Sequence, residues 1–189
     1  MMKLVAGIFI GGRGSRMGGK AKGLLREPDG ERTLIERSTD LLQRACPAAE
    51  TLLVGQHEAY AHLPLEVLPD ATSGDGPLAG LVALLRRARA AQAQALAIAC
   101  DLPYLTAPTL KRLCTVAPDA DAVAPRPDGV WQPLLARYRP AACLSIAEAQ
   151  LRAGQLAVWR VLEALGERAI AIELDAGEVR DWDTPEDMA

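Results

Sequence analysis

The sequence predicts a three-layer α/β/α fold, in which a mostly parallel, mixed sheet lies between two layers of helices. Short apolar runs alternate along the whole chain with longer segments of helical periodicity, which is typical of such a sheet. Residues 95–100 are apolar at every position, as expected of a strand buried on both faces. With 189 residues, of which 50% are hydrophobic, the chain can form one compact core, and we expect a single domain over residues 1–189.

The first half of the chain supplies three predicted strands and two predicted helices. The apolar run at residues 5–10 predicts a buried strand and not a secretion signal, because Gly-Gly-Arg-Gly follows it without a small-residue cleavage site. Pro47 cannot continue the first helix, and Pro77 suits the first position of the second. The predicted strands span 5–10, 51–54 and 65–68, and the predicted helices span 33–45 and 78–89.

The second half continues the alternation, starting with the strand at residues 95–100. The predicted helices span 109–116, 141–153 and 158–165, and the other predicted strands span 121–124, 133–138 and 169–174. In sheets of this kind, ligands bind beyond the carboxyl ends of the strands. Two features are expected at that edge: a glycine-rich loop after the first strand, and Asp101, directly after the strand 95–100.

Composition argues against several classes of function. The net charge of −3 gives no overall basic balance for nucleic-acid binding, and no apolar stretch approaches the roughly 20 residues of a membrane helix. The four cysteines lack Cys-x-x-Cys spacing, which favours reduced, partly buried thiols in a cytoplasmic protein over a disulfide framework or a zinc site.

Charge is nevertheless distributed unevenly. Residues 1–26 hold six cations and no carboxylate, whereas residues 173–189 hold seven carboxylates and one cation. These two segments either serve a polyanion and a metal ion or are ordinary solvated surfaces, and charge alone favours the second interpretation.

Residues 11–23 form a loop rich in glycine and in cations. Glycine lets backbone N–H groups approach a phosphate closely, and cations stabilise its charge. The loop is not a Walker A motif, because no Gly-Lys-Ser/Thr follows at the required spacing, and its glycine intervals differ from those of the dinucleotide-binding fingerprint. The composition favours phosphate binding over a merely flexible loop.

This loop resembles the signature loop of sugar-nucleotide and cofactor nucleotidyltransferases, in which glycines, an arginine and Met-Gly precede a lysine. The doubled glycine after Met17 is similar to the version found in molybdenum cofactor guanylyltransferases. The resemblance implies that Arg16 and Lys22, with Arg13 as a third candidate, neutralise the triphosphate and the transition state. The nucleotide-binding residues that it implies here are Phe9, Ile10, Gly11, Gly12, Gly14 and Lys22.

The chain departs from the family pattern at two places. Phe9-Ile10 replaces the usual Leu-Ala before the glycine pair, which is expected to reshape the base pocket. Ala21 replaces the usual Asp before the lysine, which removes a carboxylate from the loop. Because of both departures, the use of a different nucleotide or a different acceptor stays open.

Two further motifs follow in the family's order. Asp101 in Cys-Asp-Leu-Pro either binds a metal ion or caps the following turn. The resemblance favours the first interpretation and implies that Asp101 binds both Mg²⁺ and the nucleotide. Gly-Pro-Leu-Ala-Gly at residues 76–80 resembles the loop on the base side of the nucleotide, so Gly76 and Asp70 are expected to contact the nucleotide. Without the resemblance, the segment indicates only a turn before a helix.

Two weaker matches follow towards the end of the chain. Gln132 precedes a segment similar to the family's strand that faces the acceptor, and we expect Gln132 near the pterin. Asp183 in Asp-Trp-Asp-Thr-Pro-Glu-Asp resembles a second metal ligand or phosphate-side ligand. The same residues also read as a helix start, with Asp183 or Thr184 as the cap.

Together the motifs imply a Rossmann-like nucleotidyltransferase that transfers GMP from GTP to the molybdenum–pterin cofactor and releases pyrophosphate. We expect Mg²⁺ as cofactor, a cytoplasmic location and contacts with molybdoenzyme maturation proteins, but no nucleic-acid or membrane partner. Two alternatives stay open. One is a cytidylyl- or other nucleotidyltransferase acting on molybdopterin, cobinamide phosphate or a sugar phosphate. The other is a non-catalytic, nucleotide-binding regulatory module.

Overall fold

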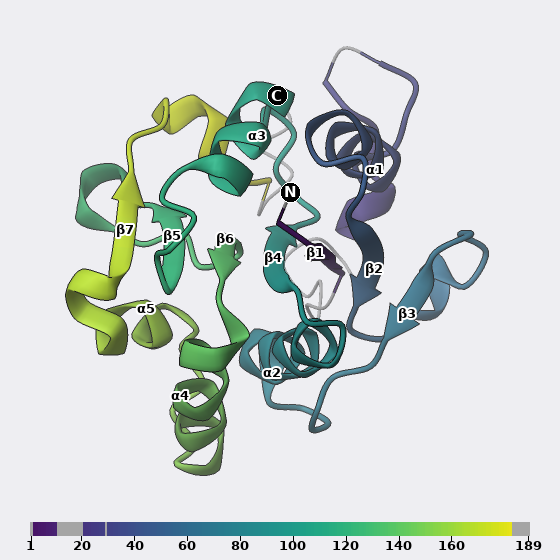
Figure 1. Cartoon of the computed structure of the whole chain (residues 1–189). Coiled ribbons are helices and arrows are strands. Elements are labelled where there is room, and N and C mark those ends of the chain that lie inside the picture. The colour runs from purple at the N-terminus through teal and green to yellow at the C-terminus, as the bar shows by residue number, and fades with distance from the viewer. Residues whose placement is uncertain (1, 11–20, 29, 183–189) are drawn as a thin grey trace.

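The structure, a computed structural model, describes residues 2–10, 21–28 and 30–182. Its centre is a seven-stranded sheet in the order β3-β2-β1-β4-β6-β5-β7. Helices α1 and α3 cover one face, and α2, α4 and α5 cover the other (Figure 1). The strands are β1 (Leu4–Phe9), β2 (Glu50–Val54), β3 (Glu66–Leu68), β4 (Gln94–Ala99), β5 (Ala122–Pro125), β6 (Leu135–Tyr138) and β7 (Ala169–Ile172). The helices are α1 (Leu34–Ala45), α2 (Gly76–Ala90), α3 (Ala107–Thr115), α4 (Pro140–Arg152) and α5 (Trp159–Leu165).

The sheet is mixed because β6 runs antiparallel to both of its neighbours, β4 and β5, whereas the other neighbouring strands named above pair in parallel. The three-layer fold with a mostly parallel, mixed sheet is therefore confirmed. Phe9 pairs with both Val54 and Ala99, so β1, β2 and β4 end at the same edge of the sheet. Asp101 lies at this edge, with Cys100 between it and the end of β4.

Four predicted boundaries were wrong by two residues. α3 begins at Ala107 and not at 109, because the Thr106 side chain caps the helix by accepting from the Thr109 N–H. β6 begins at Leu135 and not at 133, because the Leu135 N–H bonds to the Gln132 carbonyl in a turn. β7 ends at Ile172 and not at 174, and the carbonyl of Glu173 instead accepts from Arg112. α2 begins at Gly76, which makes Pro77 its second residue and not its first.

Two apolar clusters hold the layers together. Leu4, Ala6 and Ile8 of β1 belong to the cluster under α1 and α3, whereas Val5 and Phe9 belong to the cluster under α2, α4 and α5. Every residue of β1 is buried, so this central strand gives the ligand edge a rigid base. Of the four cysteines, Cys46 is half-buried and the other three are buried, and all are unpaired thiols. Within the described ranges, no helix has the length and apolar character needed to cross a membrane.

Candidate active site

Lys22 and Asp101 form the polar centre of the ligand edge. Lys22 opens the short 3₁₀ turn Lys22–Leu24, and its Nζ donates to Oδ2 of Asp101 at 2.9 Å. The side chains are 21% and 17% exposed, respectively, so water screens the pair only partly. The structure thus joins two sequence-predicted residues that lie 79 positions apart.

Tyr60 holds the turn that carries Lys22. The Gly23 N–H donates to Oη of Tyr60 at 2.9 Å, and the Tyr60 side chain is buried. A Cβ at Gly23 would lie 3.0 Å from Oη of Tyr60 and 3.4 Å from Cβ of Cys100, so a larger residue here would require Tyr60 to shift by a few tenths of an ångström. Burial raises the pKa of Tyr60 well above its usual range, which keeps the hydroxyl neutral. Sequence analysis missed Tyr60, because a lone tyrosine in a polar segment belongs to no recognisable motif.

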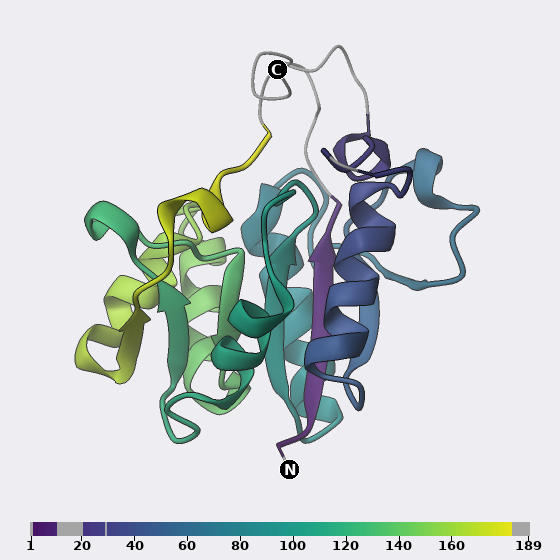
Figure 2. The same cartoon turned by 90° about the horizontal axis from the view of Figure 1, so that it is seen from above.

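The loop after Asp101 is tied to the end of the described chain. The Trp182 N–H donates to the Asp101 carbonyl at 3.1 Å. The Trp182 ring meets Tyr104 edge to face, with centroids 6.4 Å apart. Figure 2 shows that the final described segment, in yellow, rises to the same edge as the carboxyl end of β1. The closing motif predicted from the sequence therefore reaches the ligand edge through Trp182.

A cavity of about 230 Å³ lies beside Asp101. Gln132 and Asp181 also line it. Gln132, the residue predicted to lie near the acceptor, therefore lines the same cavity as Asp101. Asp181 was not selected from the sequence, although its alternation with Asp183 around the buried Trp182 was a usable signal.

A second group of predicted residues gathers at the start of α2. Asp70 follows β3, and its Oδ1 lies 3.0 Å from the position that a Cβ on Gly80 would occupy. The Phe9 ring lies equally close to that position, so Gly80 lets both side chains pack against α2. Burial raises the pKa of Asp70. Gly76 is the exposed first residue of α2, and among the described residues the Asp75 side chain makes no capping hydrogen bond to the helix N–H groups.

Ile10 is buried directly after β1, and its N–H donates to the Val54 carbonyl at 3.0 Å. The remaining predicted site residues lie outside the described residues. These are Gly11, Gly12, Arg13, Gly14, Arg16 and Asp183.

The carboxylates suit a hard cation, although they do not form a complete cage. In the part of the chain that the structure describes, no three His, Cys, Asp or Glu side chains form a metal-binding group. Mg²⁺ usually needs only one or two protein carboxylates, with water and phosphate oxygens as its other ligands. Asp101 and Asp181 line the same cavity, so the residues present fit such an ion.

The fold and this edge define a protein of the nucleotidyltransferase class. A lysine–carboxylate pair beyond the carboxyl ends of the central strands, with Lys22 in its own 3₁₀ turn and Asp101 after β4, can hold phosphate charge, and the cavity beside it can receive an acceptor. The comparisons give a more specific result. The MobA-like NTP transferase domain family matches residues 6–169, and the chain belongs to this family.

Curated relatives agree with this membership. The molybdenum cofactor guanylyltransferase of Pseudomonas syringae pv. tomato is 35% identical over 92% of this chain and 84% of its own length. The enzyme of the same name from Ectopseudomonas mendocina is 33% identical over 96% of this chain and 88% of its own. The resemblance predicted from the sequence is thus confirmed.

Solved structures confirm the fold. Molybdopterin-guanine dinucleotide biosynthesis protein A from Archaeoglobus fulgidus superimposes with a TM-score of 0.76 at 23% identity, covering 99% of this chain and 95% of that one. The 2-C-methyl-D-erythritol 4-phosphate cytidylyltransferase from Thermus thermophilus gives 0.71 at 19% identity, covering 97% and 95%. Enzymes that differ in nucleotide and acceptor therefore share this fold.

Proposed function

We propose that the protein transfers GMP from GTP to the terminal phosphate of the molybdenum–pterin cofactor. The observation that carries the proposal is the Lys22–Asp101 pair at the ligand edge, in a chain whose relatives are named for this reaction. An acceptor phosphate oxygen attacks the α-phosphorus of GTP, the bond to the β-phosphate oxygen breaks, and pyrophosphate leaves. No general base is required, because a phosphate monoester is already ionised at neutral pH.

The residues of this chain contribute mainly charge and position to the reaction. Lys22 exchanges its contact with Asp101 for a phosphate oxygen when the triphosphate enters. Asp70 and the start of α2 hold the base side, and Gln132 orients the pterin in the cavity beside Asp101. Arg16, Arg13 and the glycines Gly11, Gly12 and Gly14 complete the phosphate site in the proposal.

Mg²⁺ is part of the proposal. Asp101 would hold it, with Asp181 beside it and with Asp183 as a further candidate ligand. When bound, Mg²⁺ supplies positive charge to the α-phosphate and to the leaving pyrophosphate. A cytoplasmic location and contacts with molybdoenzyme maturation proteins stay predictions.

The test is a transfer assay with purified protein, Mg²⁺ and the molybdenum–pterin acceptor, in which GTP, CTP, ATP and UTP are compared. We expect pyrophosphate release with GTP and a product whose mass equals that of the acceptor plus GMP. A product formed with CTP and not with GTP would replace the substrate while keeping the class of enzyme. Nucleotide binding without release from any nucleotide would favour a regulatory module.

A further inference from the structure

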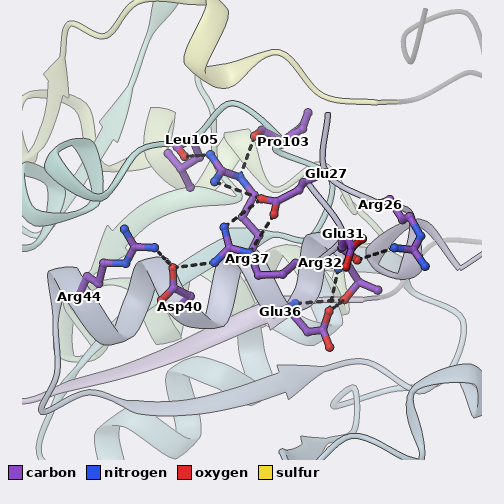
Figure 3. A network of polar contacts seen from close by, with 11 residues as sticks. Arg26, Glu27, Glu31, Arg32, Glu36, Arg37, Asp40, Arg44, Pro103 and Leu105 are labelled. Carbon is purple, nitrogen blue, oxygen red and sulfur yellow. Dashed lines mark hydrogen bonds and ion pairs between the residues drawn. The ribbon is translucent and has the colours of Figure 1, made fainter. Parts of the chain in front are cut away.

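Arg37 connects helix α1 to the loop that follows Asp101. Its Nε donates to the Pro103 carbonyl at 2.8 Å, and its Nη2 donates to the Leu105 carbonyl at 2.6 Å (Figure 3). The guanidinium is planar and holds several N–H donors in a fixed fork, so one side chain fixes two carbonyls at once. The Leu105 N–H also bonds to the Leu102 carbonyl, which closes the loop into a turn.

The same guanidinium faces the segment that follows Lys22. Its Nη1 lies 3.7 Å from Oε2 of Glu27, and the two side chains are only 19% and 11% exposed. Arg32 donates to both carboxylate oxygens of Glu27, at 2.8 and 3.2 Å. Backbone hydrogen bonds from Leu34 to Leu25 and from Glu27 to Arg32, both 2.9 Å long, hold this segment against the start of α1.

The N-terminus of α1 gives Arg37 a firm base. Thr33 and Glu36 form a capping box: the Thr33 hydroxyl accepts from the Glu36 N–H, and the Glu36 carboxylate accepts from the Thr33 N–H. Arg37 is the next residue, and its own N–H bonds to the Thr33 carbonyl. The position of its side chain is therefore fixed from the helix as well as from the two loops.

We propose that Arg37 is a positioning residue for the Lys22–Asp101 pair. Through Glu27 it contacts the segment after Lys22, and through Pro103 and Leu105 it contacts the loop after Asp101. Arg37 thereby fixes the distance between the two halves of the site without touching the substrate. The catalytic part of this inference rests on the proposed function, whereas the effect on the loop does not.

The outer part of the network supplies a matched control. Arg44 lies on the same helix and pairs with Asp40, which Arg32 also contacts, at 3.1 Å. In Figure 3, the contacts of Arg44 and Asp40 are with each other and with Arg32, whereas, among the residues drawn, Arg37 alone contacts the carbonyls of Pro103 and Leu105. Arg44→Ala thus removes a cation from this network and leaves both hydrogen bonds from Arg37 to the Asp101 loop in place.

The experiment compares Arg37→Ala, Arg37→Lys and Arg44→Ala with the wild type. For Arg37→Ala we expect kcat to fall about tenfold to a hundredfold with a much smaller change in KM for GTP, because a misplaced catalytic group affects the transition state more than nucleotide binding. Arg37→Lys keeps the charge but cannot reproduce the fork, so its kcat should be intermediate. Arg44→Ala should match the wild type. In an Asp101→Ala background, Arg37→Ala should have little further effect on kcat.

Hydrogen exchange provides a readout that does not depend on the reaction. The amides of Leu102, Tyr104 and Leu105 should exchange about tenfold faster in Arg37→Ala than in the wild type. In Arg44→Ala they should exchange at the wild-type rate. If another nucleotide replaces GTP, the kinetic comparison is made with that nucleotide. If none is turned over, exchange decides the claim alone. Unchanged exchange at these amides, or a kcat within about twofold of wild type in folded Arg37→Ala, would overturn the proposal.

Discussion

Lys22 and Arg137 are cations at opposite ends of the sheet, and they are held in different ways. Lys22 donates to the carboxylate of Asp101 and keeps 21% of its side chain exposed. Arg137 is fully buried in β6 and donates to the carbonyl of Cys114 in the last turn of α3 and to those of Val116 and Ala117 just beyond it. Its partner in β4 is Leu96, near the end of that strand away from Asp101.

This difference distinguishes Arg137, a cation that stabilises the fold, from Lys22, a cation that can bind the substrate. Three backbone carbonyls at the C-terminal end of α3 accept from the Nη1 and Nη2 groups of Arg137, and complete burial leaves the side chain no route to a ligand. An exchangeable carboxylate partner beside a cavity leaves Lys22 able to transfer to a phosphate. The comparison predicts that substitutions at the Asp101 end reduce turnover and that substitutions at the Arg137 end reduce stability.

The largest expected effect is that of Asp101→Ala on turnover. We expect kcat for pyrophosphate release at saturating Mg²⁺ to fall by about 100-fold to 1,000-fold, because a charge-stabilising group is lost from the reacting centre. The free energy of unfolding should change by about 1 kcal/mol or less, since a partly exposed ion pair contributes little. Turnover close to that of the wild type would remove Asp101 from the mechanism.

Arg137→Met should lower stability and leave turnover unchanged. Three carbonyls lose their donor, and the free energy of unfolding should fall by about 3 kcal/mol, with kcat per folded molecule unchanged. Denaturant unfolding measures the loss. Arg139→Ala is the control: this half-exposed neighbour contacts Pro118 and Asp121 and should cost under about 1 kcal/mol. Equal losses in the two variants would refute the structural role of Arg137.

Tyr60→Phe should have an intermediate effect at the ligand edge. It removes the acceptor of the Gly23 N–H, which is buried, and should cost about 1 to 2 kcal/mol of stability. Because the turn also carries Lys22, we expect KM for GTP to rise about fivefold. Thermal unfolding and steady-state kinetics measure the two effects, and a change in neither would show that Tyr60 does not hold the turn.

The smallest expected effect is that of Asp70→Asn on the pH dependence of stability. Its pKa in the folded protein is raised by burial, so the folded state binds the proton more tightly than the unfolded state, and stability falls as pH rises through that raised pKa. Asp70→Asn removes this cost. Its melting temperature should therefore exceed that of the wild type by more at pH 7 than at pH 4, although partial exposure keeps the gain below about 1 kcal/mol. A difference independent of pH would contradict the assignment.

Most of the fold was predictable from the sequence, because periodicity reports which face of an element is buried. The runs at residues 5–10 and 95–100 contain no polar side chain, and the central strands β1 and β4 cover most of their length. The boundaries that failed depend on contacts outside the element, such as the turn bond from Leu135 to Gln132 and the engagement of Glu173 by Arg112.

The candidate site was predictable only where a motif marked it. Asp101, Gln132 and Asp70 stand next to recognisable turns and strand ends. Tyr60 and Arg37 act through contacts with residues 37 and 66 positions away, respectively. Local sequence contains no signal for such pairs, because the fold alone brings them together.

The most direct test of the ligand edge is nucleotide-dependent thermal stabilisation of the wild type and of Lys22→Ala, with Mg²⁺ and GTP, CTP, ATP or UTP. A nucleotide present at 100 times its Kd stabilises the folded state by about 2.7 kcal/mol. We predict a clear rise in melting temperature with GTP for the wild type and a much smaller rise for Lys22→Ala. Equal stabilisation of both proteins, or no response to any nucleotide, would contradict the assignment of this edge as the triphosphate site.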